Sequence, residues 1–276
     1  MSKLKKIVEE AKESKCREVD LSDKGIQNVN EVPGLMMLDH LTQLTMSHNK
    51  LTAVPPSIGE LANLSILNLF NNLIEELPTS LSGMQQLKHL NLGMNRLYHL
   101  PRGFGSFPKL EILDLSYNNL TEQSLPANFF FMTSLRGLYL ADNEFETFPS
   151  EVTKLKNLQI LSLRDNDLVS LPKEIGDLSK LRELHVQGNR LTVLPPEIGR
   201  LDLTGSKGVF KVDRNPWVQP IKDQFQLGIN HVFDYIKSET YEYLYGRHMS
   251  ANPAPPPKKA DKSKKTSRKP LQHKNK

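Results

Sequence analysis

The chain of 276 residues has one cysteine, one tryptophan and no apolar run long enough for a signal peptide or a membrane span. A single cysteine excludes an intrachain disulfide, which favours a reducing compartment. In such a compartment the two N-x-[ST] sequons, at Asn63 and Asn119, are expected to stay unmodified. These absences predict a cytoplasmic protein.

The sequence also lacks a catalytic motif. Gly205, Ser206 and Lys207 look superficially like a phosphate loop, but the spacing from Gly199 is wrong and GK[ST] is absent. The histidines have no metal-ligand spacing. Cys16, the only thiol, falls at an inward position of the first predicted strand, where cysteine acts as a small hydrophobic residue. We therefore expect no enzyme activity, no cofactor and no metal site.

What the sequence does contain is a repeat. Seven asparagines recur at intervals of 23, 23, 23, 25, 23 and 23 residues: Asn49, Asn72, Asn95, Asn118, Asn143, Asn166 and Asn189. Each closes the frame L-x-x-L-x-L-x-x-N-x-Φ, in which Φ is apolar. This frame is typical of leucine-rich repeats. It predicts an α/β solenoid, a leucine-rich-repeat horseshoe with a parallel concave β-sheet, in which each repeat adds one strand.

The asparagines are expected to form a structural ladder. An Asn side chain carries donors and an acceptor on a short stem, so it can satisfy buried backbone groups in the turn after each strand. Proline follows four residues after Φ in six repeats, which predicts an extended or short helical return path on the convex side. The repeat after Leu120 has two extra residues before Pro126, and we expect them on the convex or edge side.

Both ends of a solenoid expose core and need caps. We expect an N-terminal cap helix in residues 1–15 and a repeat array over residues 16–217, with seven clear repeats between two degenerate ones. Apolar residues spaced by three and four predict a C-terminal cap helix over 218–249, with Gly246 as a credible stop.

Residues 250–276 are expected to be a disordered basic tail. They hold nine Lys or Arg and one Asp, which gives this segment a charge of +8 and leaves −3 for the rest of a chain whose net charge is +5. The composition of the tail argues against nucleic-acid binding, because no aromatic residues lie between the lysines. A solvated tail, a nuclear-localisation-like segment and a weak contact with an anionic membrane surface all stay open.

The concave face is the predicted partner-binding site. The third, fifth, seventh and eighth positions of each frame project from the sheet into the concavity. Because strands lie about 4.8 Å apart, aromatic and Met side chains from four repeats could form a patch about 15 Å long. The predicted site comprises Ile66, Asn68, Phe70, Asn91, Met94, Ile112, Asp114, Tyr117, Tyr139 and Arg164.

Several stretches of the chain resemble the intracellular leucine-rich-repeat adaptors of the Ras suppressor protein family. They are LSLRDNDL at 161–168, QGNRLTVLPPE at 187–197, NPW at 215–217 and YLYGRHM at 243–249. The resemblance spans the whole chain. It implies a non-catalytic, monomeric adaptor at integrin cell–matrix adhesions, enriched at focal adhesions, which modulates Ras-dependent signalling.

The resemblance also implies a partner. The family binds the LIM-domain protein PINCH and, through it, integrin-linked kinase and parvin. We expect the C-terminal LIM domain of PINCH to dock on the concave face, with Phe70, Tyr117 and Tyr139 as anchors. Three alternatives compete: a direct regulator of a Ras-family GTPase pathway or a phosphatase subunit through the same face, an enzyme such as a ubiquitin ligase that uses Cys16, and a membrane-surface protein that acts through its tail.

Overall fold

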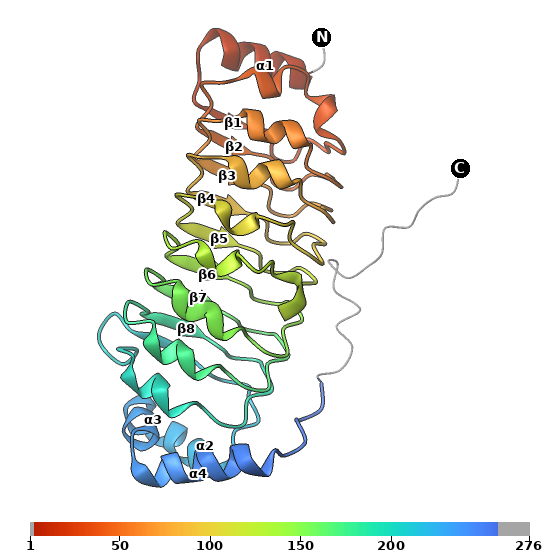
Figure 1. Cartoon of the computed structure of the whole chain (residues 1–276). Coiled ribbons are helices and arrows are strands. Elements are labelled where there is room, and N and C mark those ends of the chain that lie inside the picture. The colour runs from red at the N-terminus through yellow and green to blue at the C-terminus, as the bar shows by residue number, and fades with distance from the viewer. Residues whose placement is uncertain (1–2, 259–276) are drawn as a thin grey trace.

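The computed structural model describes residues 3–258 and is an elongated array of stacked turns (Figure 1). Over this range, strands joined in sequence order form one parallel sheet. They are β1 (Glu18–Asp20), β2 (Gln43–Thr45), β3 (Ile66–Asn68), β4 (His89–Asn91), β5 (Ile112–Asp114), β6 (Gly137–Tyr139), β7 (Ile160–Ser162), β8 (Glu183–His185) and β9 (Val209–Lys211). The predicted leucine-rich-repeat solenoid is confirmed.

Each strand contributes one central side chain to the core and two flanking side chains to the concave face. In β5, Leu113 is fully buried while Ile112 and Asp114 are partly exposed. The central residue lies opposite the same residue of the next strand, as in the pair Leu113 and Leu138. Because side chains alternate along a strand, this register places every third and fifth frame position on one continuous surface.

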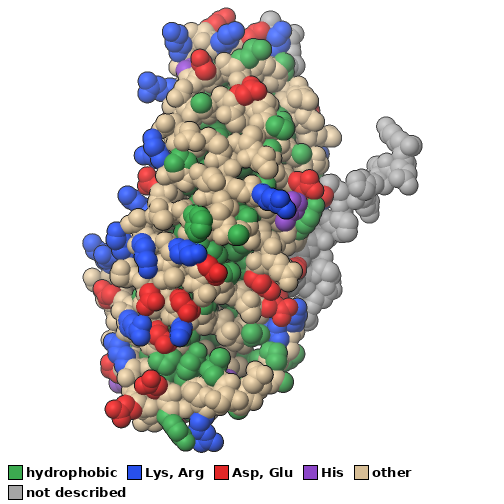
Figure 2. Space-filling model, in the orientation of Figure 1, with side chains coloured by type: hydrophobic (Ala, Val, Ile, Leu, Met, Phe, Trp, Pro, Cys, Tyr) green, Lys and Arg blue, Asp and Glu red, His purple; other side chains and the backbone are tan. Residues whose placement is uncertain are grey.

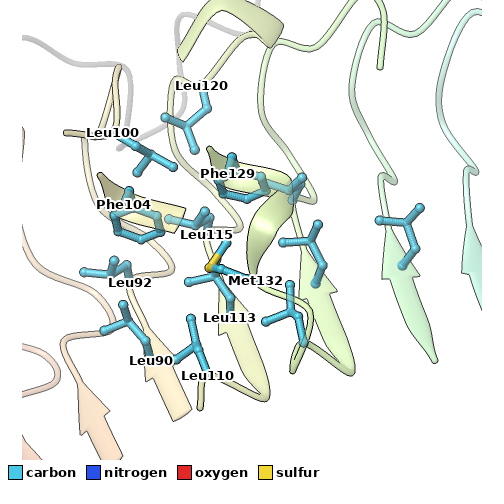
Figure 3. Packing of buried hydrophobic residues seen from close by; sticks show 14 of the residues in the cluster. Leu90, Leu92, Leu100, Phe104, Leu110, Leu113, Leu115, Leu120, Phe129 and Met132 are labelled. Carbon is cyan, nitrogen blue, oxygen red and sulfur yellow. The ribbon is translucent and has the colours of Figure 1, made fainter. Parts of the chain in front are cut away.

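The two extra residues after Leu120 lie between β5 and β6, where the chain forms the 3-10 helix Glu122–Ser124, and the strands on either side stay in register. Buried phenylalanines pack in the core of this repeat and of the repeat before it (Figure 3). Phe129 stacks on Phe104 with ring centroids 6.3 Å apart, and Phe130 contacts Phe129 edge-on at 5.2 Å. The insertion therefore leaves the register of the concave strands unchanged.

The return paths are mostly extended segments with short 3-10 helices. Prolines such as Pro172 precede several of them in an extended conformation, where no ladder hydrogen bond is lost. In the described residues these helices are Val29–Glu31, Leu35–Met37, Pro56–Glu60, Thr79–Gly83, Phe104–Ser106, Glu122–Ser124, Phe129–Phe131, Ser150–Lys154, Lys173–Asp177 and Pro196–Arg200.

The asparagine ladder satisfies the turn after each strand. Asn118 is fully buried, and its amide donates to the carbonyls of Leu92, Leu115 and Ser116 at 3.0–3.2 Å. Its Oδ1 accepts the backbone N–H of Leu97 at 3.0 Å. The other six asparagines bond in the same manner, and so does Asn215 in the last, degenerate repeat. Each asparagine thus ties together consecutive repeats.

Helix α1 (Lys3–Glu13) covers the first strand through Val8 and Ala11, which are buried. The inward position predicted for Cys16 is wrong. Cys16 is exposed, and its thiol donates to the carbonyl of Glu18 at 3.1 Å. In later repeats, the return path of the preceding repeat buries the residue at the first frame position. No repeat precedes the one that begins at Cys16, so Cys16 stays exposed.

The single cap helix predicted over 218–249 is instead three helices. They are α2 (Gln219–Leu227), α3 (Ile229–Ile236) and α4 (Glu239–Ala251). Gly228 separates the first two with φ 122°, a conformation that L side chains rarely adopt. Ser238 begins α4 by accepting the N–H of Tyr241 at 3.2 Å. Gly246 is not a stop, because α4 continues to Ala251.

The disordered tail predicted over 250–276 is wrong at its start, because Ser250 and Ala251 belong to α4. Residues 252–258 contact the array, with Pro256 accepting a hydrogen bond from Arg190, while residues 259–276 lie outside the described residues. None of the helices in residues 3–258 is both long and apolar enough to cross a membrane.

Candidate functional site

The ten residues predicted for the partner site are all partly exposed, as expected for side chains that line a concave sheet. Six of them line one cavity of about 290 Å³ over β3 to β6. These six are Ile66, Asn68, Asn91, Ile112, Asp114 and Tyr139. His89 of β4 also lines the cavity and was not among the residues predicted for the site.

A glycine shapes one wall of this cavity. A Cβ atom at Gly137 would lie 3.0 Å from Cδ1 of Ile112 and 3.2 Å from Cε2 of Tyr139. The missing side chain therefore lets Ile112 and Tyr139 converge over the backbone of β6. A glycine at the third frame position between two large neighbours is the sequence signal from which this convergence could have been predicted.

Three polar residues of the cavity are held in place by the turns that follow their strands. The side-chain oxygen of Asn68 accepts the N–H of Phe70 at 3.0 Å, and that of Asn91 accepts the N–H of Gly93 at 3.0 Å. Asp114 accepts the N–H of Ser116 in the same way, at 2.8 Å. These hydrogen bonds order the side chains before a ligand arrives, which lowers the entropy cost of binding.

The other four predicted residues, Phe70, Met94, Tyr117 and Arg164, do not line this cavity. They belong to the seventh and eighth frame positions, beyond the strand ends. Phe70 packs edge-on against His48 with ring centroids 5.5 Å apart, and its Cδ2 lies 3.2 Å from where a Cβ of Gly93 would be. The predicted single patch is thus a cavity and, next to it, a row of strand-end side chains.

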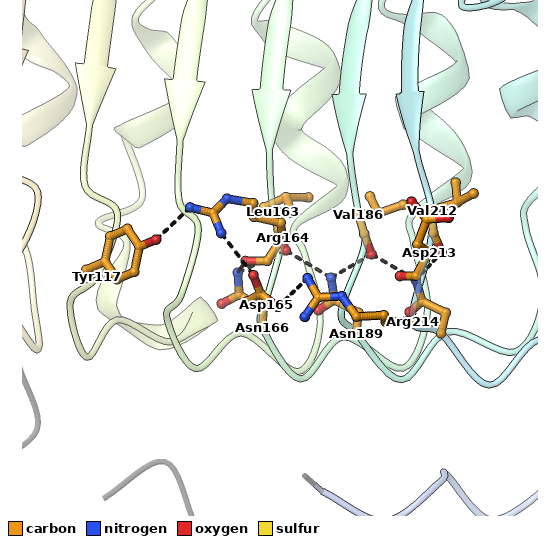
Figure 4. A network of polar contacts seen from close by, with 11 residues as sticks. Tyr117, Leu163, Arg164, Asp165, Asn166, Val186, Asn189, Val212, Asp213 and Arg214 are labelled. Carbon is orange, nitrogen blue, oxygen red and sulfur yellow. Dashed lines mark hydrogen bonds and ion pairs between the residues drawn. The ribbon is translucent and has the colours of Figure 1, made fainter. Parts of the chain in front are cut away.

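Arg164 and Tyr117 form a polar bridge along this row (Figure 4). Nη2 of Arg164 donates to the Tyr117 hydroxyl at 2.7 Å, and the guanidinium lies 5.5 Å from the ring centroid. Nη1 of Arg164 donates to Asp165 at 3.0 Å, and Asp165 also pairs with Arg214 at 3.1 Å. Arg164, two repeats away, therefore holds Tyr117 and orients its ring before any partner binds.

The charge of Arg164 is stabilised by this bridge. Partial burial acts to lower the pKa of Arg164, but the hydroxyl of Tyr117 and the carboxylate of Asp165 outweigh burial, so the pKa is raised. Burial, with Glu183 and Asp114 nearby, likewise raises the pKa of Tyr139. At neutral pH the concave face therefore presents a fixed cation at Arg164 and a neutral phenol at Tyr139.

The eighth frame position has a left-handed backbone throughout the array. The residues there include types that tolerate this conformation, such as Asn, Asp and Gly. Met94, Tyr117 and Arg214 do not belong to those types, yet Met94 adopts a φ value of 52° and the other two adopt 58°. Such strain costs on the order of 1–3 kcal/mol per residue and clusters at binding sites. Met94 and Tyr117 belong to the predicted patch, and Arg214 does not.

Among residues 3–258 no group of three or more His, Cys, Asp or Glu side chains is arranged to hold a metal ion. The arrangement on the concave face consists of apolar and aromatic walls, ordered amide and carboxylate groups and an arginine. Such a surface is suited to contact with another protein.

Two leucine-rich-repeat family models match the chain, one described as a leucine-rich repeat region over residues 102–204 and one as a leucine rich repeat over residues 39–97 and 63–120. Among solved structures, the chain is similar to the ectodomain of the plant membrane receptor kinase GASSHO1/SCHENGEN3 from Arabidopsis thaliana, in complex with CASPARIAN STRIP INTEGRITY FACTOR 2. That match has a TM-score of 0.58 and 31% identity, and covers 67% of this chain and 23% of that one. A Leptospira interrogans leucine-rich-repeat protein is also similar, with a TM-score of 0.55, 25% identity and coverages of 75% and 69%.

The fold and its concave face define a leucine-rich-repeat protein, a class of protein-interaction scaffolds. Among curated proteins, the chain is 74% identical over 276 residues to Ras suppressor protein 1 of Homo sapiens, and 76% identical over 277 residues to that of Mus musculus. Each alignment covers 100% of both chains. The chain belongs to the Ras suppressor protein family.

Proposed function

We propose that this protein is a non-catalytic adaptor that binds a LIM-domain partner through its concave face. The observation that carries the proposal is the preformed cavity, where Ile112 and Tyr139 converge over Gly137. Met94 and Tyr117, beside the cavity, keep large side chains on a left-handed backbone that Asn would adopt at lower cost. This supports a role for the same surface in binding, because such strain is found at binding sites.

The particular partner comes from the family resemblance. We propose the C-terminal LIM domain of PINCH, and through it integrin-linked kinase and parvin, with the protein acting as a monomer in the cytoplasm, enriched at focal adhesions. The cavity takes one apolar side chain of the LIM module, and the ordered Asn68, Asn91 and Asp114 offer hydrogen bonds at its rim. Arg164 adds a positive charge at the C-terminal side of the site.

Calorimetry with the purified C-terminal LIM domain of PINCH tests this function. We expect submicromolar binding by the parent chain. Binding should be lost in a Phe70→Ala/Tyr117→Ala/Tyr139→Ala variant, because buried aromatic hot spots typically contribute about 2 kcal/mol or more each. Phe131→Ala is the matched control, since Phe131 is 60% exposed and lies in a convex-side 3-10 helix.

The possible outcomes distinguish the adaptor role, the face that binds and the identity of the partner. Binding that survives in a folded triple variant would retain the adaptor role and move the site to another surface. Binding lost in Phe131→Ala instead would place the partner on the convex side. A parent chain without affinity for the LIM domain would remove this partner altogether.

A second candidate function follows from the name of the relatives, Ras suppressor protein 1. In this alternative the concave face binds a Ras-family GTPase or a phosphatase subunit directly. A pull-down with the GTPase loaded with GDP or with a GTP analogue distinguishes it, because a direct regulator should prefer one nucleotide state. Equal or absent capture in both states would count against it.

A further inference from the structure

Residues 252–258 form a short strap that lies along the flank of the array. Asn252 ends α4 in a left-handed conformation, with φ 43°, and its N–H donates to the carbonyl of Met249 at 3.2 Å. The last turn of α4 is itself fastened to the array, because the side chains of His248 and Thr192 are hydrogen-bonded at 3.0 Å. The chain then turns back and runs beside the loops of the final repeats (Figure 1).

The far end of the strap is held by a buried cation and an acidic side chain. Nε of Arg190 donates to the carbonyl of Pro256 at 2.6 Å. Two residues later, Nζ of Lys258 pairs with Oε1 of Glu146. Figure 2 shows acidic side chains beside Lys and Arg side chains on the right-hand side of the molecule. The strap ends at the carboxylate of Glu146, next to the buried Arg190.

Arg190 is placed to hold the strap. It is only 6% exposed, and its Nη1 lies 3.6 Å from Oε2 of Glu146, so that Glu146 has a cation on each side. A comparable pair, Arg96 and Glu75, lies earlier on the array at 4.0 Å. The strap makes its polar contacts with the repeats at Arg190 and Glu146 instead. The pair of Arg96 and Glu75 therefore serves as a control for the pair of Arg190 and Glu146.

The strap is stiff but loosely packed. Four of its seven residues are proline, which limits the conformational entropy that docking removes. A cavity of about 290 Å³ remains between it and the array, lined by Val169, Ser170 and Val193 on one side and Pro253 and Pro255 on the other. A segment with few buried contacts opens locally at low free energy. These features suit an element that closes and opens.

We propose that residues 252–258 are a reversible latch, held by Arg190 and Glu146, that sets where the lysine-rich C-terminal segment leaves the array. Eight of the nine Lys and Arg residues of 250–276 follow Lys258 in the sequence. With the latch closed, this charge starts beside the repeat that contains Tyr139 and Glu146. With the latch open, it starts at the end of α4. An anionic partner that binds Lys258 competes with Glu146 and opens the latch.

Trypsin cleavage of the full chain tests the latch, since trypsin must bind Lys258 to cut the bond after it. Cleavage of a transiently opened segment follows the open population. We expect Glu146→Gln to raise the initial rate of this cut about twofold to fivefold, the range for an exposed ion pair. Arg190→Gln should raise it about tenfold, because a hydrogen bond from a charged donor is lost. Mass spectrometry of the fragment ending at Lys258 gives the rate.

Glu75→Gln and Arg96→Gln are the matched controls and should leave this rate unchanged. A fragment that forms equally fast in the parent chain, Glu146→Gln and Arg190→Gln would overturn the latch. A rate that rises as much in Glu75→Gln as in Glu146→Gln would also overturn it, because the effect would then be general.

A second measurement avoids changing the buried arginine. Replacing Pro255, Pro256 and Pro257 by glycine leaves the array intact and increases the entropy lost when the strap docks. We expect the Nε–H resonance of Arg190 to exchange with water at least fivefold faster in this variant than in the parent chain. An unchanged exchange rate would mean that Arg190 is protected without the strap, and the proposal would be wrong.

Discussion

In each repeat, the residues at the sixth and ninth frame positions stabilise the fold, whereas those at the seventh and eighth positions belong to the proposed binding face. The sixth position is an apolar residue such as Leu115, fully buried in the core. The ninth is the ladder asparagine, whose amide holds the turn. Between them, the seventh and eighth positions face the concavity. Met94 and Tyr117 occupy the eighth position in spite of its left-handed backbone.

We expect Asn118→Leu to lower the free energy of unfolding by about 2–4 kcal/mol. The change leaves the buried N–H of Leu97 without its partner, which costs about 1–3 kcal/mol. It also removes one hydrogen bond from each of the carbonyls of Leu92 and Leu115, which still accept from Asn95 and Asn143, and each such bond contributes about 0.5–1.5 kcal/mol. Urea denaturation followed by circular dichroism gives the value. Asn215→Leu, at the partly exposed end of the ladder, should cost less. Equal effects at both positions would contradict this account.

We expect Met94→Asn to raise the free energy of unfolding by about 1 kcal/mol, because Asn tolerates the left-handed backbone better than Met. The same change should weaken binding of the LIM domain. Met94→Ala is the control, since it removes the side chain without relieving the strain, and it should not stabilise the fold. Thermal unfolding and calorimetry measure the two effects. Loss of stability in Met94→Asn would show that the Met side chain packs more favourably than the strain costs.

At the scale of elements, helix α4 connects the cap to the last full repeat. Tyr241 is fully buried, and its hydroxyl donates to the carbonyl of Leu194 at 2.6 Å while accepting the N–H of the same residue at 3.0 Å. Burial raises the pKa of Tyr241 far above its ordinary value of 10.0. The hydroxyl of Tyr241 thus satisfies both backbone groups of Leu194.

We expect Tyr241→Phe to destabilise the protein by about 1–3 kcal/mol at pH 7, because both backbone groups of Leu194 lose their partner. Chemical denaturation measures this change. Tyr245→Phe is a suitable control, as Tyr245 is only partly buried. A variant as stable as the parent chain would show that water replaces the hydroxyl.

The same variant tests the pH dependence. A raised pKa in the folded state means that the contribution of Tyr241 is complete below pH 10 and is lost as pH rises from there towards the folded-state pKa. Above pH 10 the parent chain should lose up to about 1.4 kcal/mol per pH unit more than Tyr241→Phe. Denaturation midpoints at about pH 9, about 10 and about 11 compare the two. Parallel curves would argue against a buried, neutral Tyr241.

At the scale of the whole molecule, the array is a stack in which each repeat contacts its neighbours through an identical register. Gln43 lies opposite Ile66 just as Ile66 lies opposite His89. Stability of such a stack is approximately a sum of repeat and nearest-neighbour terms. The caps and the strap are the elements that break this uniformity.

A repeat can therefore be removed without loss of the fold. Deleting residues 41–63 brings Leu64 into the frame position of Leu41, and β3 then pairs with β1. We expect a folded protein with a modestly lower unfolding midpoint and unchanged LIM-domain affinity, because the ten site residues begin at Ile66. Deleting residues 64–86 should fold equally well and bind at least tenfold more weakly. Circular dichroism measures the unfolding midpoint of each shortened chain, and calorimetry measures its affinity for the LIM domain. Unfolding of both shortened chains would show that the repeats are not interchangeable.

Much of this architecture was predictable because the repeat is local and self-similar. The spacing of Asn49 to Asn189 determined the strands, the ladder and the concave face, since each repeat needs only the same neighbour to complete its core. It also identified the concave side chains by strand alternation. The ten residues of the proposed partner site could therefore be assigned to one surface from the repeat alone.

The tertiary structure decided what depends on contacts between distant or non-repeating segments. The exposure of Cys16, the three helices of the cap and the contact of Arg190 with Pro256 lie where the periodicity ends. The bridge from Arg164 to Tyr117 joins residues 47 positions apart. The sequence by itself determined the repeating backbone, because the pattern within each repeat and the stacking of neighbouring repeats favour the same structure. Only the tertiary structure decided which side chains from distant or non-repeating segments contact each other, because folding is what brings them together.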